Sequence, residues 1–401
     1  MSVPLDRLYN FLRDISKSHD ILIYRYLPHG SRKVTDCLPL TSLEGRWQSI
    51  RIVCHDQESL NRYEFQDKKL LNPIPGVPWS VFKTITSPAV GGTAELHDQT
   101  LLLHSELNSK DLEWFEQNGA VGVYWWCHAV IAQDWFRYAE HDPTLNTWPS
   151  PKYDFLVYNR AWTGLREYRL KFTEMVVDSN LVDNCLMKFN PIDQGKHYQL
   201  HQFENSKFNI SRPDLEDWFE PSDAGSAASA DYNETDYNQS WIEVVLETVF
   251  DDTKWHLTEK ALRPIAVGKP FILGATPGSL KYLHSYGFKT FSECWDESYD
   301  DIQDPVERLN AIVELMKTLS NLDKTLLRHK LQEICNYNQC RFFSKEFHQQ
   351  VVNELKTNLD LAANSIKTAK SYKYFANKVN TRIVLDSEFT EYAQKWLRDN
   401  Q

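Results

Sequence analysis

The segment WHLTEKALRP, residues 255–264, lies between two apolar runs, and the order of these three pieces predicts the fold. Before it comes WIEVVLETVF (241–250), which is rich in β-branched residues and predicts a buried strand. After it comes KPFILG (269–274), a second short strand. The residues between them suffice for one helix, which Thr258 can cap. Strand, helix and strand in this order predict a βαβ unit of a parallel sheet.

Glu259 and Lys260 open this predicted helix, where ligands of parallel sheets bind. A helix N-terminus with an adjacent lysine attracts phosphate, and a nearby carboxylate can accept hydrogen bonds from a ribose diol. The pair therefore favours a nucleoside diphosphate ligand. The alternative for the dipeptide alone is a capped surface helix with two solvated side chains.

The longer segment TEKALRPIAVGKPFILGATPGSLKYLHSYGFKTF (258–291) resembles the donor-binding half of GT-B glycosyltransferases, especially the fucosyltransferase and exostosin-like families. Its continuation through residue 308 is also similar to uncharacterised glycosyltransferase-like proteins of bacteriophages. The detailed resemblance covers about residues 153–320. It implies that the segment beginning at Thr258 binds a nucleotide sugar, with Glu259 on the ribose and Lys260 on the pyrophosphate.

Residues 151–341 are therefore expected to form the donor domain. It opens with the apolar strand 153–158, followed by a loop that carries Arg160 and Arg166. A strand-to-helix loop with two arginines suits a pyrophosphate, and the related glycosyltransferases have a basic residue there. The alternative is that these arginines form surface ion pairs with Glu167 or Glu174. Residues 205–240, acidic and rich in small polar residues, are predicted to be a mobile loop, either a lid or a passive insertion.

Residues 1–150 alternate strand and helix patterns and predict a first α/β domain, which would bind the acceptor. The strands at 50–54 and 100–103 both run into a histidine followed closely by a glutamate. Parallel strands would bring both loops to one rim. The candidates for the base that deprotonates the acceptor are Glu58 first, with His55 and Asp56 in its loop, then His104 and Glu106.

Glu58-Ser59 resembles a Glu-Ser pair of fucosyltransferases whose glutamate is proposed as the base. The alternative is a turn in which Asp56 caps Ser59 and Arg62. Residues 305–401 read as successive helices, and those in 342–401 are expected to pack back on the first domain. The expected architecture is thus GT-B-like, with two Rossmann-like α/β domains facing a cleft and a C-terminal helical extension.

The composition bears on the kind of partner and on the cellular compartment that are expected. The 401 residues carry a net charge of −11, which disfavours a nucleic-acid partner. Seven scattered cysteines without CxxC spacing favour a reducing cytoplasm, which would be that of the host if the chain is phage-encoded. The longest apolar run, 120–132, is too short to span a membrane, and no signal peptide is expected.

No metal site is expected, because the acidic run 296–301 lacks the DxD strand context of metal-dependent glycosyltransferases. The sequence therefore predicts a metal-independent glycosyltransferase without a cofactor, which moves a hexose or pentose from a nucleoside diphosphate sugar to a glycan or another hydroxyl acceptor. One alternative is a phage enzyme that glycosylates hydroxymethylated DNA bases. Another is an inactive GT-B fold that serves as a binding or virion-associated protein.

Overall fold

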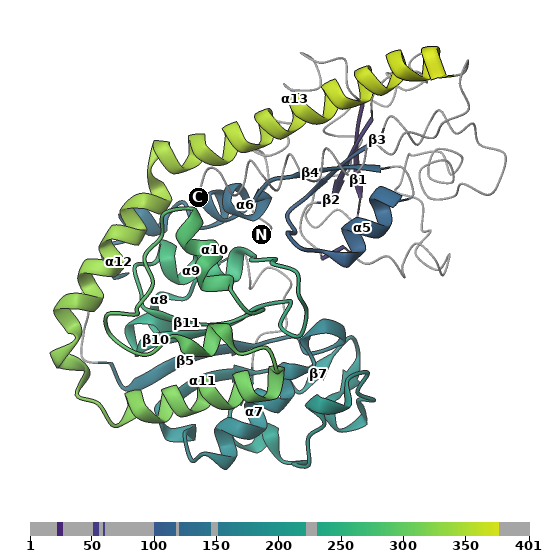
Figure 1. The fold of residues 1–401 in the computed structure, drawn as a ribbon. Helices are drawn as coiled ribbons and strands as arrows, with labels where there is room; N and C mark the ends of the chain where they lie inside the picture. The colour runs from purple at the N-terminus through teal and green to yellow at the C-terminus, as the bar shows by residue number, and fades with distance from the viewer. Residues whose placement is uncertain are drawn as a thin grey trace. The chain divides into compact units, whose positions relative to one another are not determined.

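The computed structural model describes residues 22–26, 51–55, 59–60, 100–117, 120–145, 151–221 and 231–376 (Figure 1). The chain forms two compact units, which are described separately. The described residues of the first unit lie between Ile131 and His348. Those of the second lie before residue 131 and after residue 348. The domain boundaries expected after residues 150 and 341 stay predictions.

A parallel sheet of five strands forms the centre of the 131–348 unit. Its order is β11-β10-β5-β6-β9, with β11 Phe271–Gly274, β10 Ser240–Leu246, β5 Tyr153–Asn159, β6 Cys185–Phe189 and β9 Glu220–Pro221. The chain runs from β5 outward to β6 and β9, then crosses to β10 and β11 on the other side. The sheet is therefore doubly wound, and its switch point lies between β5 and β10.

The predicted βαβ unit is confirmed. Helix α9 spans Glu259–Ala266 between β10 and β11, and these two strands pair in parallel. Thr258 caps the helix, because its side chain accepts a hydrogen bond from the Lys260 N–H. Strand β10 ends at Leu246, four residues before the end of the predicted run, so Glu247 lies at the carboxyl edge of the sheet.

Helices cover both faces of this sheet (Figure 1). Helices α7 (Tyr168–Asp178) and α11 (Pro305–Ser320) lie on one face, and α8 (Glu234–Asn238), α9 and α10 (Ser279–Ser285) lie on the other. Helix α12 (Arg328–Phe343) packs on α9, where Gln339 Nε2 donates to the Ala266 carbonyl at 2.8 Å.

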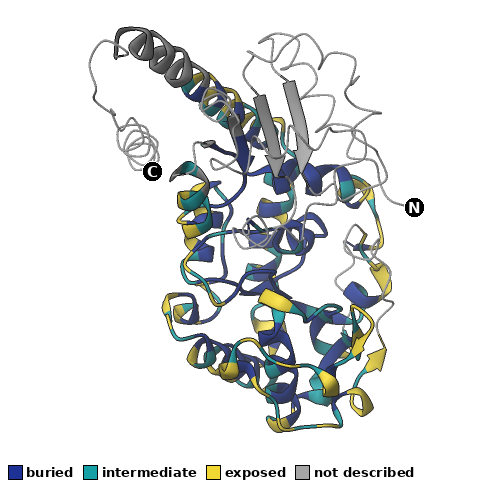
Figure 2. Cartoon of the chain, turned by 90° about the vertical axis from the view of Figure 1, so that its right-hand side faces the viewer, coloured by how far each residue is buried: buried dark blue, intermediate teal, exposed yellow. Residues whose placement is uncertain are grey.

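The core follows the alternation of side chains along the strands. Leu156 and Leu186 enter a cluster with Tyr237 and Val267, whereas Phe189 joins Leu170 and Trp162 in a second cluster. These residues are buried, and in Figure 2 dark blue marks the inner elements of the described chain while yellow lies mainly on its outer turns. Alternating strand residues thus bury both faces of the sheet.

The described parts of 205–240 contain regular elements that the predicted loop did not include, while the mobility of the segment stays a prediction. These parts contain β9, α8 and short 3-10 helices, and β9 is an edge strand of the sheet. Polar side chains form local caps here: Asn205 accepts from the Lys207 N–H and Asn233 from the Asp236 N–H. Part of the polar composition of this segment therefore reflects capping. Strands β7 (Ile192–Asp193) and β8 (Lys196–His197) precede this segment as an antiparallel hairpin.

The second unit contains a parallel sheet of four strands in chain order. These are β1 Leu22–Tyr26, β2 Arg51–His55, β3 Thr100–His104 and β4 Ala120–Tyr124. Strands β2 and β3 confirm the strands predicted at 50–54 and 100–103 to within about one residue. Helix α5 (Lys110–Gln117) joins β3 to β4, and its Leu112 N–H donates to the Ser109 hydroxyl, as expected of a cap. Helix α6 (Cys127–Trp135) follows β4, and residues 136–138 form a turn.

Helix α13 (Lys345–Ala376) contributes its later turns to this second unit. Asn358 Nδ2 donates to the Tyr124 carbonyl at 2.7 Å, and Glu354 accepts from the Trp126 N–H at 3.0 Å. Side chains of α13 thus satisfy a backbone carbonyl and an N–H group at the end of β4.

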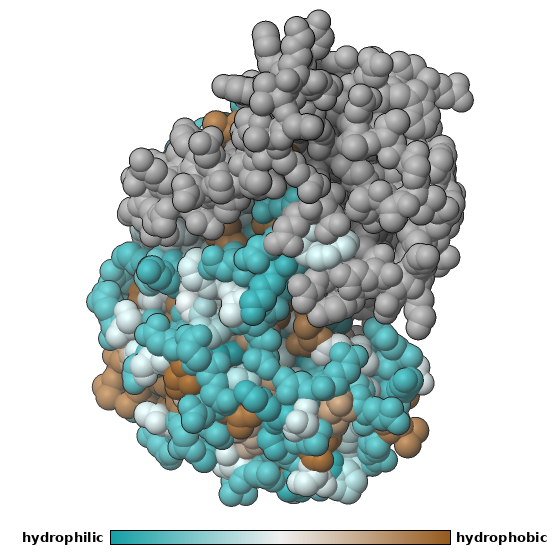
Figure 3. Space-filling model, turned by 45° about the vertical axis from the view of Figure 1, so that its right-hand side comes forward, coloured by the Kyte–Doolittle hydropathy of each residue, from teal (hydrophilic) through white to brown (hydrophobic). Residues whose placement is uncertain are grey.

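The described surface is mostly polar on the face seen in Figure 3, where hydrophobic residues lie in small separate groups. No helix in the described ranges is both long enough and apolar enough to cross a membrane.

A buried ion pair links α9 to the sheet, and its removal tests the packing of that face. Arg263 Nη2 donates to Glu243 at 2.5 Å, and Tyr237 bonds both side chains. Arg263→Met leaves a buried carboxylate without its cation, so we expect a loss of about 3–5 kcal/mol in the free energy of unfolding, measured with urea. Lys317→Met, which breaks the exposed pair with Glu314, should cost less than about 1 kcal/mol. Equal losses for the two variants would contradict the assignment.

Candidate functional site

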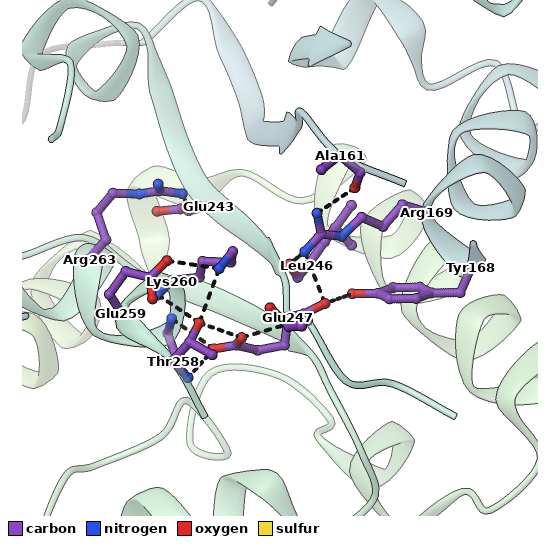
Figure 4. Close-up of polar contacts among 12 residues, drawn as sticks. Ala161, Tyr168, Arg169, Glu243, Leu246, Glu247, Thr258, Glu259, Lys260 and Arg263 are labelled. Atoms are coloured by element: carbon purple, nitrogen blue, oxygen red, sulfur yellow. Dashed lines mark hydrogen bonds and ion pairs between the residues drawn. The ribbon is translucent and has the colours of Figure 1, made fainter. Parts of the chain in front are cut away.

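Glu247 organises the N-terminus of α9 (Figure 4). Its carboxylate is fully buried and accepts from the Thr258 N–H at 2.9 Å, the Thr258 hydroxyl at 2.7 Å and the Ala261 N–H at 3.2 Å. It also accepts from the Thr248 N–H at 3.1 Å. The helix N-terminus thus has an internal carboxylate where the sequence favoured a bound phosphate, so a phosphate at this helix would have to bind through side chains.

Lys260 and Glu259 form an ion pair at this edge. Lys260 Nζ lies 2.8 Å from Glu259 Oε1 and 3.3 Å from the Thr258 hydroxyl. The Lys260 side chain is 23% exposed and that of Glu259 is 7% exposed, so the ammonium is the more accessible of the two groups. An ammonium can donate three hydrogen bonds, which leaves Lys260 a further donor for an anion.

Arg160 follows β5 at the other side of the switch point. Its guanidinium lies over the Tyr158 ring, 4.4 Å from the centroid, and Arg263 lies over the same ring at 4.5 Å. The Nε and Nη1 atoms of Arg160 are buried and bond no acceptor in the described part of the chain. Burial and the charge of Arg263 lower the pKa of Arg160. The side chain therefore has donors available for an anionic ligand.

Arg166 lies in the same loop, in the 3-10 helix Gly164–Arg166, and is half-buried. Burial acts to raise the pKa of Asp193, but hydrogen bonds from Thr163 and Trp162 and the charge of Arg166 together hold that pKa below its usual range. Arg166 thus stabilises the carboxylate that anchors its own loop.

The ion-pair partners considered for these arginines have other contacts. Glu167 accepts from His201 Nε2 at 2.7 Å, and Glu174 accepts from Lys171 Nζ at 2.7 Å. Arg160 stacks on Tyr158 instead of pairing with either carboxylate. The structure therefore brings Arg160, Thr258, Glu259 and Lys260 to one edge of one sheet, whatever their role.

Arg169 and Glu247 are residues of this edge that the sequence analysis missed. Arg169 is 3% exposed and donates to main-chain carbonyls at the ends of both β5 and β10. Two signals were available: Glu243 and Glu247 interrupt an apolar run, and Arg169 lies within the helix pattern after β5. Buried charged residues of this kind need specific partners.

In the second unit, Glu106 joins the two loops that the sequence placed together. Strands β2 and β3 pair in parallel, and the Glu106 carboxylate accepts from the Ser59 hydroxyl at 2.8 Å and the Leu60 N–H at 2.5 Å. The Ser109 hydroxyl also donates to it at 2.6 Å. Glu106 is 1% exposed, so in this conformation it anchors the loop at Ser59.

His104 is buried beside it. Its Nδ1 accepts from the Glu106 N–H at 3.3 Å, and its ring meets Tyr124 edge-on at 6.0 Å. His55 closes β2, while Asp56 and Glu58 lie outside the described residues. The choice among these candidate bases therefore stays a prediction.

The acidic run 296–301 consists largely of caps and anchors. Asp296 accepts from the Ser298 N–H, and Glu297 from the Thr290 hydroxyl and the Phe291 N–H. Asp300 accepts from the Leu280 N–H at 3.0 Å, at the start of α10. Over the ranges that the structure describes, no group of three or more His, Cys, Asp or Glu side chains is arranged to hold a metal ion.

No protein-family model matches the chain, and no curated protein is significantly similar to it in sequence.

The protonation of Asp300 should make the free energy of unfolding depend on pH. Burial raises the pKa of its carboxyl to about 7, although the backbone hydrogen bonds oppose the shift. The unfolded value is about 3.9, so between these values the folded state holds the extra proton. The free energy of unfolding contributed by Asp300 should therefore fall as pH rises from about 4 to 7, by up to about 1.4 kcal/mol per pH unit.

Urea unfolding of Asp300→Asn at several pH values measures this slope. The stability of the variant relative to the wild type should rise between pH 5 and 8, because asparagine does not titrate. The exposed Asp217→Asn serves as the control and should keep the wild-type slope. Parallel pH profiles for the wild type and Asp300→Asn would contradict the shifted pKa.

Proposed function

We propose that this protein is a metal-independent glycosyltransferase of GT-B architecture, which transfers a sugar from a nucleoside diphosphate sugar to a hydroxyl acceptor. The observation that carries the proposal is the position of Arg160. It follows β5 at the switch point of a doubly wound parallel sheet and has two buried donor atoms without acceptors in the described chain. Switch points of such sheets are where nucleotides bind.

Two further features support a diphosphate ligand at this edge. Lys260 lies at the carboxyl end of the neighbouring strand, β10, with its ammonium partly exposed. Glu259 lies beside it and can accept hydrogen bonds from ribose hydroxyls. A cation on each side of the switch point suits a ligand with two phosphates.

The proposed reaction uses these groups in defined roles. A carboxylate of the second unit, with Glu58 the first choice, removes the proton of the acceptor hydroxyl. The hydroxyl oxygen forms the new bond to the anomeric carbon, and the bond from that carbon to the diphosphate oxygen breaks. Lys260 and Arg160, with Arg166 nearby, stabilise the charge of the departing diphosphate, so the mechanism as proposed requires no divalent ion.

The GT-B architecture itself rests on two parallel sheets, one in each unit, and on the later turns of α13. The hydrogen bonds of Glu354 and Asn358 to the end of β4 support the expected packing of the C-terminal helices on the first domain, whose strands belong to the second unit. Five cysteines are free thiols, which fits the proposed reducing cytoplasm: Cys127, Cys185, Cys294, Cys335 and Cys340.

Lys260→Ala tests the donor site. The nucleoside diphosphate is first chosen by the largest thermal shift among common nucleotide sugars. The variant should bind it about tenfold or more weakly, because a charge-assisted phosphate contact contributes roughly 1.5–3 kcal/mol. Calorimetric titration measures the affinity.

Lys330→Ala, which removes a surface ion pair on α12, is the control and should bind normally. Unchanged affinity in Lys260→Ala would refute the donor assignment. If the wild type binds no nucleotide sugar, the outcome favours a protein that binds another partner without catalysis.

Glu58→Gln tests the base. A general base contributes about 10²–10⁴-fold, so turnover should fall by that order while donor affinity and melting temperature stay near the wild-type values. Steady-state kinetics with donor and acceptor measure it. Because Glu106 anchors Ser59 and Leu60, Glu106→Gln should lower the melting temperature as well as turnover. Normal turnover in Glu58→Gln, with loss in His104→Ala or Glu106→Gln, would assign the role to the second loop.

A further inference from the structure

We infer that Arg169 is a positioning residue, which holds the loop that carries Arg160 and the helix that carries Lys260 at a fixed spacing across the switch point. The inference rests on the proposed diphosphate site and names the group that aligns its two halves. Arg169 itself lies in α7 and is buried beneath the edge.

The Arg169 guanidinium donates hydrogen bonds to both sides of the switch point (Figure 4). Nη1 donates to the Ala161 carbonyl at 2.7 Å, directly after Arg160. Nη2 donates to the carbonyls of Leu246 at 2.7 Å and Glu247 at 3.1 Å, at the end of β10. One planar group thus joins the ends of the two strands that flank the switch point, and its rigidity fixes their separation.

A chain of hydrogen bonds through Glu247 connects the end of β10 to the helix that carries Lys260. The Glu247 main chain is held by Arg169 and by the Tyr168 hydroxyl, which donates to the Glu247 carbonyl at 2.5 Å. The Glu247 side chain holds Thr258 and Ala261. These contacts connect the arginine on α7 to the first turn of α9 without a gap (Figure 4).

Stability alone is a poor reason for an arginine at this position. Its acceptors are carbonyls, no carboxylate pairs with it among the residues described, and its Nε bonds no acceptor there. Burial lowers the pKa of Arg169, because the charged guanidinium loses its hydration there. A cation buried in this way is costly, whereas the geometry that it imposes on two loops serves a bound ligand.

Arg169→Met and Arg169→Lys test the inference with inorganic pyrophosphate as the probe. Lysine keeps the charge, but its single nitrogen cannot span the two sites that the Nη1 and Nη2 atoms of the guanidinium reach. If position is what matters, both variants should bind pyrophosphate about tenfold or more weakly by calorimetric titration. The double variant Arg169→Met/Lys260→Ala should bind little more weakly than Lys260→Ala alone, because both changes disable the same contact.

Arg308→Met is the matched control. Arg308 is also a buried arginine whose guanidinium donates to carbonyls, those of Phe250 and Ile302, but it contacts neither Ala161 nor Leu246 nor Glu247. It should lose stability yet bind pyrophosphate as the wild type does. Equal affinities for Arg169→Met and Arg308→Met would overturn the inference. So would wild-type affinity in Arg169→Lys, because charge and not position would then be sufficient.

Amide hydrogen exchange separates this inference from the proposed function. Exchange at Thr258 and Ala261 should be roughly tenfold faster in Arg169→Met and unchanged in Arg308→Met, with no ligand present. If the wild type binds no pyrophosphate, the diphosphate proposal fails, and exchange alone decides whether Arg169 positions α9. Tyr168→Phe, which removes one hydrogen bond to Glu247, gives the same readout if Arg169→Met does not fold. Unchanged exchange in the folded variants overturns the inference.

Discussion

A single buried carboxylate, that of Glu247, accepts four hydrogen bonds at the carboxyl edge of the larger sheet. The first amides of a helix have no partner in the helix itself and carry partial positive charge. By supplying the partner from the preceding strand, Glu247 fixes where α9 begins relative to β10. The direction of the Thr258 hydroxyl, and with it the position of the Lys260 ammonium, depends on this contact.

Positively charged side chains lie at the ends of β5 and β10, although the chain as a whole is acidic. The sequence carries a net charge of −11, yet Arg160 and Arg169 bring two guanidinium groups to the ends of β5 and β10. Arg169 donates to main-chain carbonyls, and Arg160 stacks on an aromatic ring. Neither guanidinium forms an ion pair with a carboxylate in the described part of the chain, although the charge of Glu243 acts on Arg160 and that of Glu247 acts on Arg169.

The sequence predicted the elements of this region well, because periodicity and capping are local properties. Thr258 as a cap, the strands on either side of α9 and the parallel pairing of β2 with β3 all follow from short patterns. Contacts between distant residues were not predictable in this way. The hydrogen bonds of Arg169 to Leu246 and of Ser59 to Glu106 join residues 77 and 47 positions apart. In the described parts of the polar segment 205–240, Asn205 and Asn233 cap short elements, which composition does not reveal.

The contacts of α13 with the end of β4 have a consequence for synthesis of the chain. The Trp126 N–H bonds Glu354, which lies 228 residues later in the sequence. At typical translation rates the ribosome needs roughly 10 to 50 seconds to make that interval. During this time the nascent β4 lacks the side chains that satisfy its end, while residues 131–348 emerge with their own complete sheet. The second unit is therefore the last whose described residues are all synthesised, although its strands are made first.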